Sequence, residues 1–287
     1  MRFLATIVSA ALLTACATIA DAPPARLAAD PFYRKHVDAA GIPILSSARV
    51  PDAALFAARD MVRGMLAHRP DLAAWLVSND YRIALISRDE ALLDLPENAN
   101  WTKPSRDDPR LTRCELKHYD ERIGSKTDRE YWDERARGIG GERMVGSEED
   151  VLGLPISRYW GETIFVHEFA HNVLFAIEGA DPGLYERVTA AYANALANDL
   201  WFEEYTTTTM QEYWAEGTQF WFNSNRLQAF DGRRILNARD LADYDPQLYA
   251  VLAEAYGDSH ELVSDPFYMH PARVPPGPPP LNTAEVC

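Results

Sequence analysis

The sequence predicts an α+β fold, with a small mixed sheet and several helices, and three local patterns support it. Apolar residues recur at helical spacing from Pro51 to about Ser78. A β-branched, alternating run from Tyr81 to Ser87 follows and predicts a strand. The segment 161–179 then predicts a helix that is apolar on nearly all sides and is therefore buried.

Composition sets the class of protein. The chain of 287 residues carries 43 Asp and Glu against 28 Lys and Arg, a net charge of −15. So acidic a protein is a poor candidate for binding nucleic acid or anionic lipid surfaces. Seven Trp, thirteen Tyr and eleven Phe indicate a packed interior. The chain is long enough for one large domain or two lobes.

The N-terminus has the features of an export signal. A basic residue, Arg2, precedes a short apolar run that ends in Leu-Thr-Ala before Cys16. This ending resembles the bacterial lipobox, which implies that residues 1–15 are a lipoprotein signal peptide and that Cys16 is acylated, for instance with palmitate. Ala17 after the cysteine favours the outer membrane, so we expect a lipid-anchored protein of the bacterial cell envelope, facing the periplasm or the exterior. An ordinary secretory signal with an incidental cysteine is the alternative.

The rest of the chain divides into three predicted regions. Residues 16–50 begin with an Ala/Pro-rich stretch and are predicted to be the lipidated tether and linker. Residues 51–265 are predicted to form the main domain, and residues 266–287 a Pro-rich C-terminal tail. Within the domain, the glycine-rich segment 137–145 predicts either a loosened strand at a sheet edge, to which a substrate adds by backbone pairing, or a plain surface hairpin.

The buried helix carries the most informative motif. His167-Glu168-Phe169-Ala170-His171 is an H-E-x-x-H pattern, whose i, i+4 spacing places both imidazoles on one helix face, where they can share a metal. Glu168 can take a proton from a metal-activated water. The alternative is two buried, hydrogen-bonded histidines, since a short pattern also arises by chance.

A second helix after Tyr205 places three polar residues in one stripe. Glu212, Glu216 and Gln219 follow the spacing i, i+4, i+7 among aromatic residues. We predict Glu212 as the third zinc ligand and Glu216 as the hydrogen-bond acceptor of a ligating histidine. A capping box between Thr209 and Glu212 is the alternative, but it leaves Glu216 unexplained. The local third histidine of other zinc motifs is excluded because Ile177 stands at its position.

Taken together, these residues resemble the gluzincin metallopeptidases, and most closely the family of the anthrax toxin lethal factor catalytic domain. That family has a tyrosine seven residues before an E-x-x-A-E segment, as Tyr205 stands before Glu212 to Glu216. The resemblance spans about residues 130–225 and implies a zincin-like fold with two lobes around a zinc cleft. It further implies that His167, His171 and Glu212 bind Zn²⁺, that Glu168 is the general base, and that Tyr205 stabilises the oxyanion. Ala170 stands where many members have glycine.

The expected function is a membrane-tethered, zinc-dependent endopeptidase acting on a peptide or protein substrate. The alternative is a non-catalytic surface lipoprotein that binds zinc or peptides, although Glu168 then has little reason to be present. A third hypothesis, a lipoprotein that docks a partner through its acidic face or its tail, predicts no bound metal. Nothing in the sequence indicates an oligomeric state.

Two cysteines remain once Cys16 is acylated. Cys114 and Cys287 would share an oxidising compartment, where they either form a disulfide that ties the tail to the body or stay free. The sequence leaves both possibilities open, because it specifies no geometry for the pair.

Overall fold

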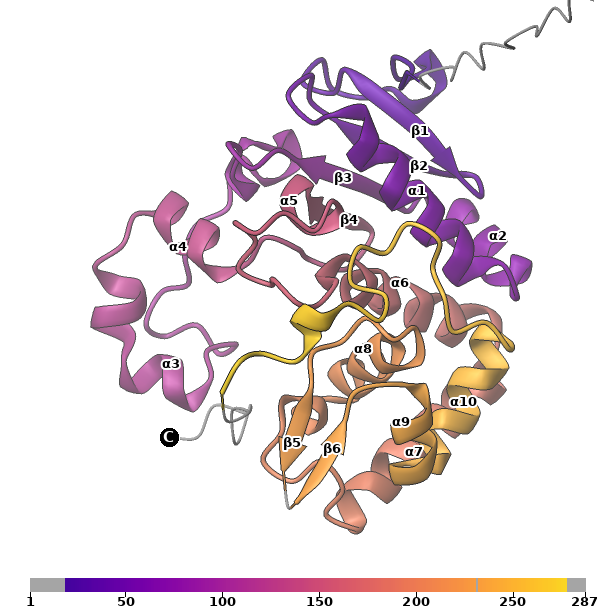
Figure 1. The fold of residues 1–287 in the computed structure, drawn as a ribbon. Coiled ribbons are helices and arrows are strands. Elements are labelled where there is room, and N and C mark those ends of the chain that lie inside the picture. The colour runs from indigo at the N-terminus through magenta and orange to yellow at the C-terminus, as the bar shows by residue number, and fades with distance from the viewer. Residues whose placement is uncertain (1–18, 231, 278–287) are drawn as a thin grey trace, which may run out of the picture.

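A four-stranded mixed sheet, flanked by helices, organises the computed structural model, which describes residues 19–230 and 232–277 (Figure 1). The strand order is β1-β2-β3-β4; β1 and β2 are antiparallel, and β2, β3 and β4 run parallel. A separate antiparallel pair, β5 and β6, lies further along the chain. The predicted α+β fold with a small mixed sheet is confirmed. The strands are β1 (Lys35–Ala39), β2 (Ile42–Ser46), β3 (Arg82–Ile86), β4 (Arg143–Ser147), β5 (Gln228–Phe230) and β6 (Arg233–Ile235).

Both faces of the large sheet are covered. Ile44 pairs with Ile83, which pairs with Met144, and these three belong to the main hydrophobic core. One residue further along, Leu45 and Val145 belong to a smaller cluster on the opposite face. Successive side chains on a strand point to opposite faces, so one short sheet supports two apolar layers.

The helices follow the predicted pattern, with one break. The helical run 51–78 is two helices, because Pro70 lacks the backbone N–H that a continuous helix needs and instead occupies the first turn of the second one. The helices are α1 (Asp52–Leu66), α2 (Pro70–Ser78), α3 (Arg113–Lys117), α4 (Asp128–Arg135), α5 (Glu148–Val151), α6 (Ile164–Ala180), α7 (Pro182–Ala197), α8 (Met210–Trp221), α9 (Ala238–Tyr244) and α10 (Pro246–Tyr256).

The folded body begins before residue 51. Strands β1 and β2 fall within residues 16–50, which the sequence analysis assigned to the tether and linker. All five residues of β2 are buried, and three of them, Ile44 to Ser46, pair with β3, so this part of the chain belongs to the sheet. At the other end, residues 271–273 form a short 3₁₀ turn in which Arg273 is buried, so the described part of the tail packs on the body.

Helix α6 lies at the centre and contacts α2, α7, α8 and β4. Ten of its side chains are buried, including Phe165, Phe169 and Val173. The approach of α2 is close: a Cβ added at Gly179 would lie 2.3 Å from the Trp75 ring. Among the described residues, no helix is both long and apolar enough to cross a bilayer.

Candidate metal centre

The N-terminus of α6 is held by a buried carboxylate. The backbone N–H groups of Ile164 and Phe165 donate to the two oxygens of Asp150, at 3.1 and 2.8 Å. These donors have no partner within the helix, so Asp150 satisfies them and fixes where α6 begins. Burial raises the pKa of Asp150 well above its usual range. The helix that carries the H-E-x-x-H motif thus starts from one defined position.

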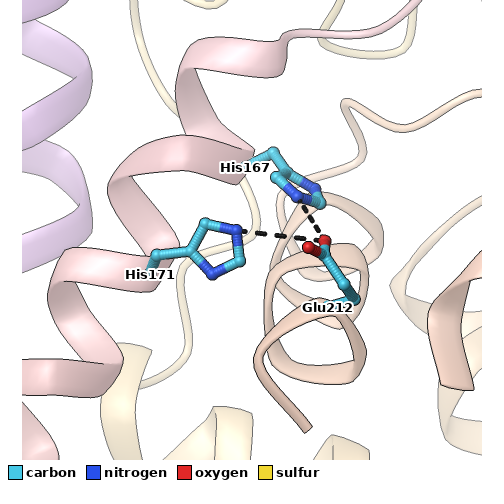
Figure 2. Close-up of side chains that lie close together, drawn as sticks. All are labelled: His167, His171 and Glu212. Atoms are coloured by element: carbon cyan, nitrogen blue, oxygen red, sulfur yellow. Dashed lines mark hydrogen bonds and ion pairs between the residues drawn. The ribbon is translucent and has the colours of Figure 1, made fainter. Parts of the chain in front are cut away.

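His167, His171 and Glu212 converge on one point between α6 and α8 (Figure 2). Their candidate ligand atoms all lie within 4.8 Å of one another. Glu212 Oε2 lies 2.9 Å from His167 Nε2 and 3.9 Å from His171 Nε2. Ligand atoms of a tetrahedral zinc ion are about 3.4 Å apart, given metal–ligand bonds of about 2.0–2.2 Å. The two distances bracket that separation, and two imidazoles with one carboxylate are a common donor set for zinc, so the residues fit the metal.

The carboxylates beside the two imidazoles favour positive charge at this point. Burial and the neighbouring His167 lower the pKa of His171 to about 4, so its ring is neutral and keeps a lone pair for a metal at neutral pH. Burial disfavours charge on His167, but hydrogen bonds to Glu212 and Glu216 outweigh it and raise the pKa of His167. Burial acts to raise the pKa of Glu212, yet its bond to His167 leaves it lowered, so this carboxylate is ionised.

A polar network supports the other side of His167. Its Nδ1 lies 3.0 Å from Gln219 Oε1 and 3.4 Å from Glu216 Oε1. Gln219 also donates to the Thr163 carbonyl at 3.1 Å. The second oxygen of Glu216 accepts from Asn225 and Gln228, both at 2.8 Å. Such partners fix the orientation of a ligating imidazole.

The structure therefore places Glu216 beside a candidate ligand, as the helical spacing indicated, but Gln219 is the nearer partner of His167. Gln219 belongs to the predicted polar stripe, where only Glu212 and Glu216 had a predicted role. Its position one turn beyond Glu216 was the available signal. No sequence signal indicated the contacts of Asn225 and Gln228 with Glu216, because both residues lie beyond the end of α8.

The alternative role of Glu212, in a capping box with Thr209, accounts only for its backbone N–H. Its N–H donates to the Thr209 hydroxyl at 3.1 Å, so Thr209 caps α8. The Glu212 side chain turns instead to His167. One residue thus takes part in the helix cap and in the candidate metal site.

Glu168 lies beside the candidate metal ligands and contacts the glycine-rich segment 137–145. Gly140 N–H donates to Glu168 Oε2 at 2.7 Å. Burial raises the pKa of Glu168. Ile139 and Val145 exchange two backbone hydrogen bonds of 3.0 and 2.9 Å, so residues 137–145 form a hairpin whose second arm is the beginning of the edge strand β4. The first arm of the hairpin lies on α6, and its Ile139 occupies the edge of β4 at Val145.

Tyr205 opens a short 3₁₀ turn, Tyr205–Thr207, just before α8. Burial and Glu212, whose carboxylate accepts a hydrogen bond from the Tyr205 hydroxyl, raise the pKa of this phenol. Tyr205 lines a cavity of about 640 Å³ together with His167, Glu168 and Glu212. The walls of the cavity also include Trp132, Gly138, Ile139, Tyr159, Glu162, Ile164, Leu227 and Pro275. Four predicted site residues, His167, Glu168, Tyr205 and Glu212, therefore line one pocket large enough for part of a peptide, and His171 lies beside them.

The cysteines are described only in part. Cys114 on α3 is buried and disulfide-bonded. Its predicted partner, Cys287, and the predicted lipidation site, Cys16, lie outside the described residues. Both assignments stay predictions.

Comparison with known proteins finds similar solved structures but no sequence family. No protein-family model matches the chain, and no curated protein matches it. The fold is similar to the structure of the PRO-PRO endopeptidase PPEP-2 from Paenibacillus alvei, with 15% sequence identity and a TM-score of 0.46. The match covers 74% of this chain and 96% of that one. At this identity and TM-score, the likeness carries no inference about activity.

Proposed function

We propose that the protein is a zinc-dependent endopeptidase that hydrolyses peptide bonds in a peptide or protein substrate. The observation that supports it is the convergence of His167, His171 and Glu212 on one point at the wall of a cavity that Glu168 and Tyr205 also line. Three protein ligands leave a zinc ion an open position, which is typical of catalytic rather than structural zinc sites.

Zinc bound there supplies Lewis acidity to the scissile carbonyl and to a water molecule. The chain supplies the proton transfers. Glu168 has one oxygen, Oε2, engaged by Gly140 N–H, and the other is left to take the proton of the attacking water. Because burial raises the pKa of Glu168, the protonated carboxyl is stabilised until it delivers the proton to the leaving amine.

Tyr205 acts on the oxyanion. Its hydroxyl is bonded to Glu212 in this structure, and its side chain is 41% exposed, so it can turn toward a substrate carbonyl. A raised pKa keeps the phenol protonated and able to donate at neutral pH. One such donor contributes a few kcal/mol to the transition state.

The proposed location follows from the N-terminus alone. Acylation of Cys16 would tether the domain to the bacterial envelope. The tether would be short, because Ala20 already contacts the folded domain: its N–H donates to Asp52 at 3.1 Å. Cys16→Ser should release the protein from membranes or leave an uncleaved precursor. A processed variant that fractionates with membranes like the parent would show that the anchor lies elsewhere.

Metal analysis and peptide hydrolysis together test the activity. The purified protein should hold one zinc per chain and cleave members of a peptide library at internal bonds, and chelation should abolish cleavage. His171→Ala should lose zinc, whereas His118→Ala, just after α3, should keep it. Full zinc occupancy without hydrolysis of any peptide would favour the non-catalytic binding protein instead.

A further inference from the structure

The backbone of residues 137–141, termed here the glycine segment, touches the proposed base directly. Besides the bond from Gly140 to Glu168 Oε2, Gly141 N–H donates to Asn172 Oδ1 at 2.7 Å. A Cβ added at Gly140 would lie 2.9 Å from the Glu168 carbonyl oxygen and 2.9 Å from His171 Cβ. Only glycine allows so close an approach to α6.

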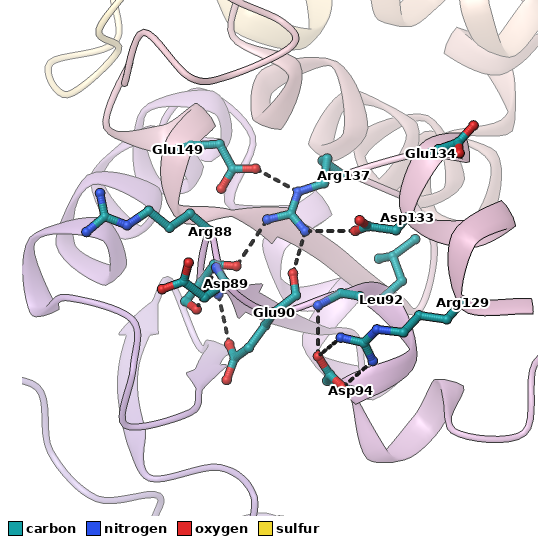
Figure 3. A network of polar contacts seen from close by, with 12 residues as sticks. Arg88, Asp89, Glu90, Leu92, Asp94, Arg129, Asp133, Glu134, Arg137 and Glu149 are labelled. Carbon is teal, nitrogen blue, oxygen red and sulfur yellow. Dashed lines mark hydrogen bonds and ion pairs between the residues drawn. The ribbon is translucent and has the colours of Figure 1, made fainter.

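The first residue of the segment, Arg137, is anchored in a buried polar network (Figure 3). Its Nε donates to Glu149 at 2.7 Å, Nη2 donates to the Ser87 carbonyl at 3.0 Å, and Nη1 donates to the Glu90 carbonyl. The side chains of Arg137 and Glu149 are only 8% and 7% exposed. One guanidinium thereby joins the end of β3, the loop that follows it, and α5.

The other end of the glycine segment is bound to α6. Asn172 lies one turn beyond Glu168 and is 1% exposed. Because its amide oxygen accepts from Gly141, the glycine segment is tied to the same helix that carries the base. Between the two anchors, the Ile139 and Val145 backbones are bonded in both directions. The position of the Gly140 N–H is therefore determined by contacts on three sides.

We propose that Arg137 and Asn172 are positioning residues that orient the carboxylate of Glu168 through the Gly140 N–H. This inference rests on the proposed peptidase function. A glutamate side chain rotates about several bonds, and an unrestrained carboxylate presents either oxygen in many directions. With Oε2 bonded to Gly140, Oε1 is the oxygen left for the proton transfer, which then begins from a fixed geometry.

Asn172→Ala tests the link, with Asn98→Ala as matched control. Both asparagines are buried and bond to backbone, but Asn98 donates to the Leu92 carbonyl at 3.2 Å, in the 3₁₀ turn Pro96–Asn98, and does not line the pocket. Asn172→Ala should lower kcat about tenfold, with KM and zinc content unchanged. Asn98→Ala should leave kcat unchanged. In a Glu168→Gln background, Asn172→Ala should cause no further loss, because its effect passes through that carboxylate.

A conservative change probes the other anchor. Arg137→Lys keeps a positive charge beside Glu149 but cannot bond to Glu149 and both carbonyls at once. It should lower kcat less than Asn172→Ala does, again at full zinc occupancy.

Amide exchange gives a readout independent of activity. In metal-free protein, the Gly140 amide should exchange slowly in the parent and in Asn98→Ala, and faster in Asn172→Ala and Glu168→Ala. Unchanged Gly140 exchange in Asn172→Ala, equal loss of kcat in Asn98→Ala, or additive loss in the Glu168→Gln background would each overturn the positioning role. If the parent hydrolyses no peptide, the proposed function fails and the role with it. If the parent is active and Asn172→Ala retains its kcat, only the positioning role fails.

Discussion

Replacement of Glu168 by glutamine separates catalysis from metal binding. The change keeps the size of the side chain and leaves His167, His171 and Glu212 in place. Glutamine has one acceptor oxygen and one NH₂ group, whereas the carboxylate has two acceptors. Because Gly140 N–H lies 2.7 Å from Oε2 and needs an acceptor, the amide oxygen should take that position. The NH₂ group then takes the place of Oε1, and it cannot accept a proton.

The size of the effect follows from that orientation. The base is lost from every molecule, so kcat should fall by the full contribution of a general base, roughly 10²–10⁴-fold. This range corresponds to about 3–5 kcal/mol in the activation free energy. Thermal stability should not fall, because burial raises the pKa of Glu168 and a neutral side chain therefore suits the site.

The assay compares zinc content, melting temperature and kcat for the parent and for two variants. Glu90→Gln is the matched control, since Glu90 is also buried and also accepts a backbone N–H, from Ser87 at 2.8 Å, but lies outside the cavity. It should retain activity. Cleavage by Glu168→Gln within tenfold of the parent rate, with contaminating proteases excluded, would refute the assignment of the base.

Three further changes have distinct signatures. Tyr205→Phe should lower kcat roughly 10²-fold with zinc retained, and an unchanged kcat would exclude an oxyanion role. Glu216→Ala should weaken zinc affinity roughly 10–100-fold by freeing His167, which a competition titration with a chelator measures; equal affinity would contradict this support. Asp265→Asn should alter the pH dependence of stability. Asp265 accepts from Thr163, its Oδ2 is buried without a partner among the described residues, and burial raises its pKa. The folded state therefore binds this proton more tightly, and the free energy of unfolding of the parent falls as pH rises from the unfolded to the folded pKa. Denaturant titrations between pH 4 and 8 should show the variant gaining stability relative to the parent as pH rises, and a constant difference would refute the burial argument.

Local patterns alone determined much of this protein. The i, i+4 spacing of His167 and His171 needs only a helix to place both rings on one face, and the structure has that helix as α6. The same reasoning aligned Glu212 with Glu216 on α8. Strand β3 was predictable because its alternation is a property of neighbouring residues.

Tertiary packing decided the rest. Strands β1 and β2 are short and follow an Ala/Pro-rich stretch, so no local signal separated them from a linker; pairing with β3 makes them part of the sheet. The partners of the base and of the first histidine come from distant segments: Gly140 reaches Glu168 across 28 positions and Gln219 reaches His167 across 52. A backbone N–H donor is present at every residue except proline, so its role depends on where the chain passes and not on which residue bears it. Periodicity therefore revealed the two helices that carry the site, while the groups that orient its side chains depend on how the segments pack.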